Sequence, residues 1–141
     1  MSEVIVTSQQ NLQNEVRYGS GHTFIADEPL EGGGDDLGPD PYTLLLAALG
    51  SCISMTVTLY AQRKNWPLEQ VMVRLRQNRI HVNDCQQCTQ NGEGYVHRIE
   101  QSVSFSGDLT DAQRERLREI SNKCPVHKTL SSQIVIAEWL E

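Results

Sequence analysis

The chain has 141 residues, of which 38% are hydrophobic and 21% are charged, and it carries a formal net charge of −6. This length and composition predict one globular domain over residues 1–141 that buries its own core, and they argue against a disordered chain. The negative charge argues against a nucleic-acid partner and against an anionic membrane surface.

The N-terminal segment from Met1 to Val6 has neither the basic start nor the apolar stretch of a secretory signal. The longest apolar run, Leu44 to Leu49, is far shorter than the roughly 20 residues of a membrane span. We therefore expect a cytoplasmic protein without a membrane partner. In that compartment, cysteines more often serve catalysis or metal binding than structural disulfides.

The first third of the chain predicts strands and then a long helix. Residues 3–8 and about 14–26 have the alternation of strands, and the glycine-rich run over 31–38 predicts a flexible acidic loop. Asp40 is a suitable N-cap for a helix whose first residue is Pro41. That helix is predicted to end near Asn65, because a proline follows at position 67.

The predicted helix is apolar over most of its circumference. One predicted face carries Leu45, Ala48, Leu49, Cys52, Met55, Thr56 and Leu59, and further apolar residues lie outside it. A helix of this kind needs cover on several sides, and one small sheet covers little more than one. The pattern therefore favours a homodimer that buries the remaining apolar surface.

The second half of the chain predicts a hairpin, a helix and a final strand. Residues 71–81 and 95–105 alternate as strands on either side of a polar turn, 83–94. Thr110 opens a helix with a capping box, and that helix is expected to carry Cys124 on its inner face before Pro125 ends it. Residues 134–139 predict a closing strand. This order of elements indicates the α+β class.

Two of the four cysteines lie in apolar helical settings. Cys52, in the middle of the long helix, is either a small hydrophobic core residue or a reactive thiol. Burial disfavours a thiolate, so the reactive alternative requires a nearby cation. Cys124, beside Lys123 at a helix end, is either a core thiol or the resolving partner of Cys52.

The other two cysteines, Cys85 and Cys88, form a CxxC motif in the polar turn. A structural zinc site needs four ligands, and the nearest candidates, His81 and His97, lack the usual spacing. The pair is therefore interpreted as an inert or weakly reactive surface pair, with zinc binding as the alternative.

Two segments of the chain resemble a known family. Residues 38–52 read GPDPYTLLLAALGSC and residues 122–130 read NKCPVHKTL. Together, in this order and spacing, they resemble the OsmC/Ohr family (osmotically inducible protein C and organic hydroperoxide resistance protein), and in particular an uncharacterised OsmC-like branch. The resemblance implies curved antiparallel sheets that wrap a long central helix in an intertwined homodimer.

The resemblance also implies a function in the response to oxidative stress. The chain would be a peroxiredoxin-like enzyme that reduces organic hydroperoxides without a cofactor or metal. Cys52 would be the peroxidatic thiol, Cys124 the resolving thiol, Arg17 the cation that holds the thiolate, and a dithiol the reductant.

One departure from the family pattern favours an alternative function. The family's active enzymes orient that arginine with a glutamate early in the long helix, but Tyr42 and Thr43 occupy the expected positions here. The alternative function is a small-molecule binding module of the same fold without efficient peroxidase activity.

Overall fold

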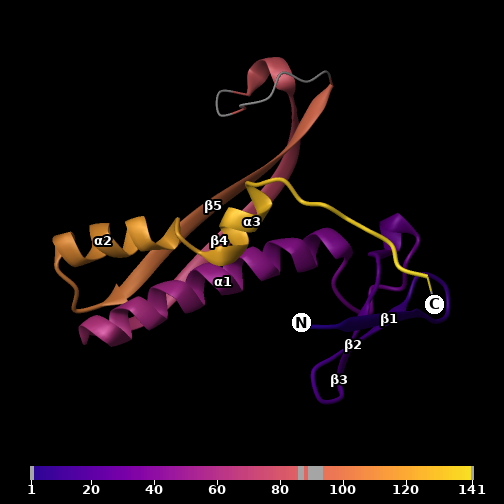
Figure 1. Cartoon of the computed structure of the whole chain (residues 1–141), viewed down its shortest axis with the longest axis horizontal. Helices are drawn as coiled ribbons and strands as arrows, with labels where there is room; N and C mark the ends of the chain where they lie inside the picture. The colour runs from indigo at the N-terminus through magenta and orange to yellow at the C-terminus, as the bar shows by residue number, and fades with distance from the viewer. Residues whose placement is uncertain (1, 86–87, 89–93, 141) are drawn as a thin grey trace. The chain divides into compact units, whose positions relative to one another are not determined.

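The computed structural model describes residues 2–85, 88 and 94–140, and these form an α+β fold with two antiparallel sheets and a long helix (Figure 1). The elements in chain order are β1 (Val4–Ser8), β2 (Asn14–Tyr18), β3 (His22–Ala26), the 3₁₀ turn η1 (Leu30–Gly32), α1 (Pro41–Lys64), β4 (Leu68–His81), the 3₁₀ turn η2 (Val82–Asp84), β5 (Tyr95–Gly107), α2 (Asp111–Ser121) and α3 (Pro125–Leu130). The predicted fold class is confirmed. The chain divides into two compact units, Met1–Ala47 and Ala48–Glu141, with the boundary inside the α1 segment. Each unit is described by itself. The single domain over residues 1–141 stays a prediction.

The N-terminal unit contains a three-stranded antiparallel sheet in the order β1-β2-β3. Val16 in the central strand is buried and pairs with Val6 on one side and Phe24 on the other. The prediction of one strand over residues 14–26 is wrong. Gly19 and Gly21 adopt φ angles of 60° and 115°, and they turn the chain between β2 and β3.

The loop after β3 is organised by one buried carboxylate. Asp27 is 2% exposed and accepts hydrogen bonds from the backbone N–H groups of Glu28 (2.8 Å), Asp35 (3.2 Å) and Leu37 (3.2 Å). The backbone also packs closely, because a Cβ added at Gly34 would lie 1.9 Å from the carbonyl oxygen of Glu28. The glycine-rich run was predicted to be a flexible loop. The structure shows instead a loop fixed by Asp27 and by close backbone packing.

Helix α1 begins and ends where local signals place it. The Asp40 carboxylate accepts a hydrogen bond from the N–H of Thr43 at 3.1 Å, so the predicted N-cap is confirmed. At the other end, Asn65 has a φ of 56°, and the N–H of Trp66 donates to the carbonyl of Ala61. This geometry is a Schellman motif, which satisfies carbonyl groups that the last turn leaves unpaired.

The buried face of α1 differs from the predicted stripe. The core residues of the helix are Leu49, Gly50, Ile53, Val57 and Ala61. Met55 and Leu59, which the prediction placed on the core face, are 64% and 60% exposed. By length and composition alone α1 also meets the criteria for a membrane-spanning helix. A core helix meets the same two criteria, and Ile53 and Val57 lie fully buried in the protein core.

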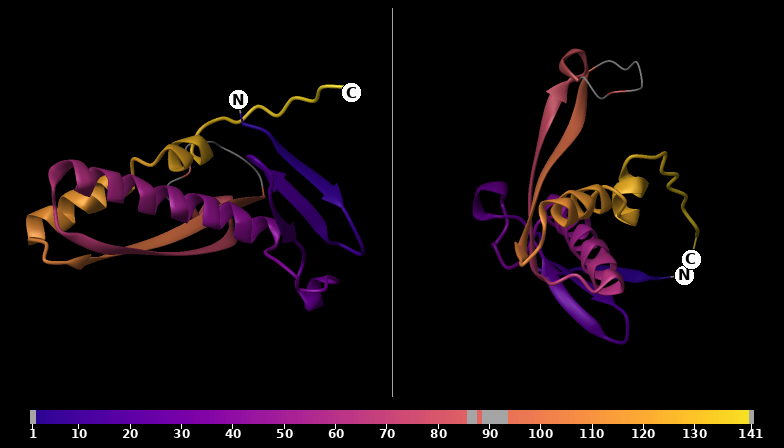
Figure 2. Two further views of the ribbon diagram at one scale, coloured as in Figure 1. Left: turned by 90° about the horizontal axis from the view of Figure 1, so that it is seen from below. Right: turned by 90° about the vertical axis from the view of Figure 1, so that its left-hand side faces the viewer.

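In the C-terminal unit, helices α1 and α2 pack on a long β4–β5 hairpin. Val73 pairs with Val103, and the buried Val103 and Phe105 share one core with Leu117 of α2 and Ile53 of α1. Figure 2 shows that the far end of the hairpin extends well beyond the helices. The side chains in that distal half are mostly exposed.

Two expectations for the C-terminal part are wrong. The capping box at Thr110 is confirmed, but α2 ends at Ser121, so Cys124 lies outside that helix. The predicted strand over residues 134–139 is absent from the described chain, where 133–140 have no regular structure and are exposed. A strand requires the edge of another strand to pair with, and this apolar segment has no such partner within the described chain.

Candidate active site

Cys52 lies in the middle of α1, on the border between its buried and exposed faces. Its side chain is half-buried and packs against the core cluster that contains Ile53 and Cys124. It is a free thiol. A thiol in this position is held by the helix and remains within reach of a ligand from solvent.

Cys124 is the N-cap of α3, and this position explains its environment. Pro125 occupies the first helical position, where no amide donor is needed, and the Sγ of Cys124 accepts a hydrogen bond from the N–H of His127 at 3.2 Å. The side chain is fully buried. The helix start therefore gives the sulfur one fixed hydrogen-bond donor inside the core.

The two free thiols are neighbours. Burial raises the pKa of the Cys124 thiol, and a hydrogen bond with the Cys52 thiol raises it further, while the N–H of His127 acts in the opposite direction. Cys124 is therefore held as a protonated thiol beside the more accessible Cys52. This arrangement suits one attacking sulfur and one sulfur that reacts only after the first has been oxidised.

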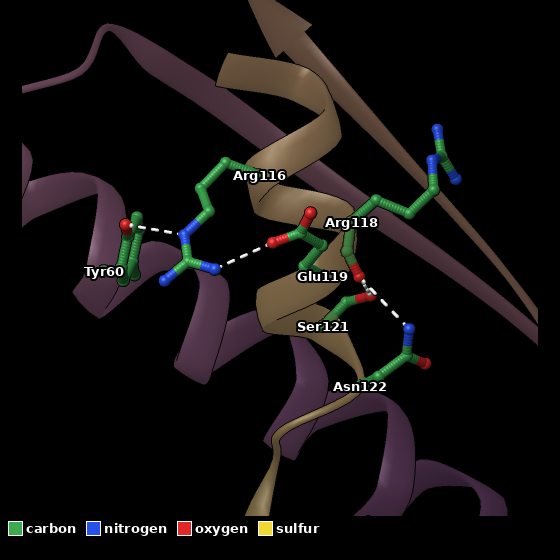
Figure 3. Close-up of polar contacts among 6 residues, drawn as sticks. All are labelled: Tyr60, Arg116, Arg118, Glu119, Ser121 and Asn122. Carbon is green, nitrogen blue, oxygen red and sulfur yellow. Dashed lines mark hydrogen bonds and ion pairs between the residues drawn. The ribbon is translucent and has the colours of Figure 1, made fainter. Parts of the chain in front are cut away.

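A polar contact joins the middle of α2 to α1 (Figure 3). The Arg116 side chain donates to the Tyr60 hydroxyl at 3.0 Å and forms an ion pair with Glu119 at 2.7 Å. The hydrogen bond from Arg116 also lowers the pKa of Tyr60. Because Tyr60 lies two turns after Cys52 on α1, this contact fixes α2, and with it the segment leading to Cys124, against the helix that carries Cys52.

Arg17 is in strand β2 of the N-terminal unit. Its guanidinium lies 3.2 Å from the Glu15 carboxylate, on the same face of the strand. Arg17 and the thiol pair belong to different units, so its predicted role toward Cys52 stays a prediction. The structure does identify a carboxylate partner for Arg17 that the sequence analysis missed, although the i, i+2 spacing of opposite charges within a strand is visible in the sequence.

The first turn of α1 contains no acidic residue. Tyr42 is 52% exposed, and the N–H of Thr43 is bonded to the Asp40 carboxylate. Asp40 is thus committed to the helix cap. Among the carboxylates of the described residues, Glu15 is the one that the structure pairs with Arg17.

A hollow of about 300 Å³ lies within the N-terminal unit. It is lined by Leu12, Asn14, Ala26, Asp27, Glu28 and Pro41. The Asp27 carboxylate already accepts three backbone hydrogen bonds, so Glu28 and Asn14 supply the polar lining that remains for a ligand. The hollow is open to solvent on one side, and its lining is mostly apolar.

Cys85 and Cys88 are joined by a disulfide, with their Cα atoms 5.5 Å apart. In this oxidised form neither sulfur is a thiolate ligand for zinc. Among the described residues, the structure contains no group of three or more His, Cys, Asp or Glu side chains placed to hold a metal ion.

Comparisons with known proteins agree with this architecture. A family model described as OsmC-like protein matches residues 32–138. No curated protein matches the sequence.

Several solved structures share the fold. An OsmC-like protein from Mycoplasma pneumoniae has a TM-score of 0.70 at 17% identity, with 93% of this chain and 87% of that chain covered. A Psychrobacter arcticus protein assigned to osmotic stress and detoxification responses has a TM-score of 0.71 at 20% identity, with coverages of 92% and 88%. The organic hydroperoxide resistance protein OsmC from Legionella pneumophila has a TM-score of 0.65 at 17% identity, also with coverages of 92% and 88%. At these identities the likeness establishes the fold alone.

Proposed function

Since the chain belongs to the OsmC-like family, we propose that it is a thiol-dependent peroxidase that reduces organic hydroperoxides through Cys52 and Cys124. The observation that carries this proposal is the contact between a half-buried Cys52 thiol and a buried, protonated Cys124 thiol. The names of two similar structures, from Legionella pneumophila and Elizabethkingia anophelis, refer to organic hydroperoxide resistance and support the substrate class.

The reaction begins at Cys52. Its thiolate attacks one oxygen of the hydroperoxide, the O–O bond breaks, and the departing alkoxide takes a proton to leave as an alcohol. Cys52 is then a sulfenic acid. The Cys124 sulfur attacks the oxidised sulfur of Cys52, and water leaves as the disulfide forms. An external dithiol reduces this disulfide by exchange and is itself oxidised.

Arg17 is proposed to stabilise the Cys52 thiolate, with Glu15 as the carboxylate that orients the guanidinium. The ion pair within β2 supports this assignment, because it supplies the carboxylate that positions 42 and 43 lack. Glu15 acts through Arg17 and is a positioning residue. Its side chain is 31% exposed and that of Arg17 is 60% exposed, so the pair contributes little to stability.

Removing the Arg17 charge should slow the first step. We expect Arg17→Ala to lower the rate of Cys52 oxidation about 10-fold at neutral pH, because the thiolate would lose the cation proposed to stabilise it. Arg17→Lys should retain most of the rate. Glu15→Gln should lower the rate of Cys52 oxidation about 2- to 5-fold, and Glu15→Asp should lower it less. The rate of single-turnover oxidation tests this series, and an unchanged rate in Arg17→Ala would remove Arg17 from the mechanism.

Free-thiol counting tests the proposed function directly. Protein with the Cys85–Cys88 disulfide intact has two free thiols, Cys52 and Cys124. One equivalent of cumene hydroperoxide should consume both. A dithiol should restore both, and alkylation with peptide mapping distinguishes them from thiols released at Cys85 and Cys88. Retention of both thiols would favour the second candidate, a binding module, which the absence of an acid in the first turn of α1 and the hollow in the N-terminal unit support.

We propose that the functional assembly is a homodimer in the cytoplasm. The exposed Met55 and Leu59 on α1 form an apolar surface, and the exposed C-terminal segment contributes Ile136 and Trp139 (93% and 74% exposed). Burial of such surface is favourable by about 25 cal/mol per Å². Light scattering should therefore give twice the 15.9 kDa chain mass, and Leu59→Asp should shift the mass toward the monomer. A wild-type monomer at micromolar concentration would contradict the dimer.

A further inference from the structure

The Cys85–Cys88 disulfide has no role in the peroxidase cycle described above. It follows η2 at the far end of the β4–β5 hairpin, where Cys85 is half-buried and Cys88 is exposed. The hairpin is held by its own ladder of paired residues from Leu68 to His81, and the disulfide closes only a short loop. Such a short loop contributes little to stability. The bond can therefore open and close without loss of the core.

The two cysteine pairs differ in oxidation state. Cys85 and Cys88 are bonded to each other, whereas Cys52 and Cys124 are neighbouring free thiols. The Cys52–Cys124 disulfide that the proposed cycle forms needs a dithiol to reduce it, and the Cys85/Cys88 pair is a dithiol when its own bond is open. The exposed Cys88 sulfur is also open to attack by an external thiolate, as an exchange site requires.

Exchange between the two pairs cannot take place within one chain in this fold. A Cβ added at Gly50 would lie 2.7 Å from the Leu75 side chain. Leu75 of β4 therefore packs beside the middle of α1, two residues from Cys52 along the helix. From Leu75 to His81 an extended strand covers about 20 Å. Thiol–disulfide exchange requires the sulfur atoms to touch, so the Cys85/Cys88 pair of one chain can serve only the thiol pair of another.

We infer that Cys85 and Cys88 form a second redox centre, which accepts electrons from an external dithiol and reduces the Cys52–Cys124 disulfide of a second copy. This inference rests on the proposed function, because it needs that disulfide to form. One thiolate of the Cys85/Cys88 dithiol attacks the Cys52–Cys124 bond and gives a mixed disulfide between the copies. The other thiolate breaks the mixed disulfide. The products are the Cys52 and Cys124 thiols and a Cys85–Cys88 disulfide, which the external dithiol then reduces.

Two complementary variants test the transfer. The donor, Cys52→Ser with Cys124→Ser, is reduced and freed of reductant. The acceptor, Cys85→Ser with Cys88→Ser, is oxidised to its Cys52–Cys124 disulfide with diamide. After mixing, alkylation and peptide mapping follow each cysteine, since positions 52 and 124 are cysteine only in the acceptor. We expect alkylated Cys52 and Cys124 to appear as alkylated Cys85 and Cys88 disappear in equal amount.

The controls separate this inference from the proposed function. A donor with all four cysteines replaced by serine should transfer nothing, and dithiothreitol should reduce the acceptor fully. If dithiothreitol reduces the acceptor but the donor variant does not, the second redox centre is overturned and the proposed peroxidase is unaffected. An acceptor that diamide cannot oxidise would overturn the relay as well. Repeating the oxidation with cumene hydroperoxide tests the peroxidase alone, because a failure there leaves the transfer from diamide-oxidised acceptor intact.

Discussion

Replacing Cys52 with serine is expected to abolish hydroperoxide consumption. The first step needs a sulfur nucleophile, and a serine hydroxyl is neither ionised at neutral pH nor able to form a stable sulfenic acid equivalent. Cys124 cannot substitute, because it is fully buried and burial raises its pKa. The rate should fall by at least about 10³-fold, as for the loss of other catalytic nucleophiles. Loss of cumene hydroperoxide in the presence of dithiothreitol measures this.

The variant should nevertheless fold. Serine has nearly the shape of cysteine, and Cys52 is only half-buried, so the midpoint of thermal unfolding should change by only a few degrees. The double variant Cys85→Ser with Cys88→Ser is the matched control, since it removes two cysteines from outside the thiol pair. With dithiothreitol supplied directly, it should consume hydroperoxide at the wild-type rate. Equal consumption by Cys52→Ser and the wild type would exclude Cys52 as the attacking residue.

The bounds of α1 were predictable because local chemistry sets them. Asp40 and Pro41 mark its start, and the left-handed Asn65 with a proline two residues later marks its end. Each signal acts within one turn of the helix, so the sequence alone reveals it. The buried face was less predictable. An almost uniformly apolar helix gives no clear stripe, and Met55 was therefore assigned to the wrong side.

The position of Cys124 could have been recognised in the sequence. A cysteine directly before Pro125 fits an N-cap followed by proline at the first helical position, and the structure has this arrangement. The prediction instead used proline as a stop signal for the preceding helix. The difference matters chemically, because the sulfur of an N-cap cysteine accepts a hydrogen bond from the N–H of His127. A cysteine on the inner face of α2 would not accept this hydrogen bond.

The absence of a strand over 134–139 and the ion pair of Arg17 were not predicted, for different physical reasons. A strand forms only where another strand offers unpaired backbone groups, and this information is not local to residues 134–139. The Glu15–Arg17 pair, in contrast, is local. The family pattern places the carboxylate early in the long helix, at positions 42 and 43, whereas in this chain the carboxylate paired with Arg17 is Glu15 in the same strand.

Replacing Cys124 with serine is expected to stop the cycle after one oxidation. Cys52 should still react with the first equivalent of hydroperoxide, but its sulfenic acid then has no neighbouring thiol with which to condense. Excess hydroperoxide should convert it to the sulfinic and sulfonic acids, which thiols do not reduce. Intact mass spectrometry should show the addition of one oxygen, then two and three. The wild type should show instead a loss of two hydrogens that a dithiol reverses. Turnover of hydroperoxide by the variant at the wild-type rate, without accumulation of the sulfinic and sulfonic acids, would contradict the assignment of Cys124.

The pH dependence of disulfide formation gives an independent check on Cys124. Because burial raises the pKa of this thiol, it is protonated at neutral pH, and its thiolate fraction rises about 10-fold for each pH unit up to that pKa. If the thiolate is the resolving species, disulfide formation after a stoichiometric oxidation of Cys52 should accelerate steadily from pH 7 through the range in which an ordinary cysteine is already ionised. Rapid quenching with an alkylating agent measures this rate. A rate that levels off below pH 8 would mean that a group other than Cys124 limits the step.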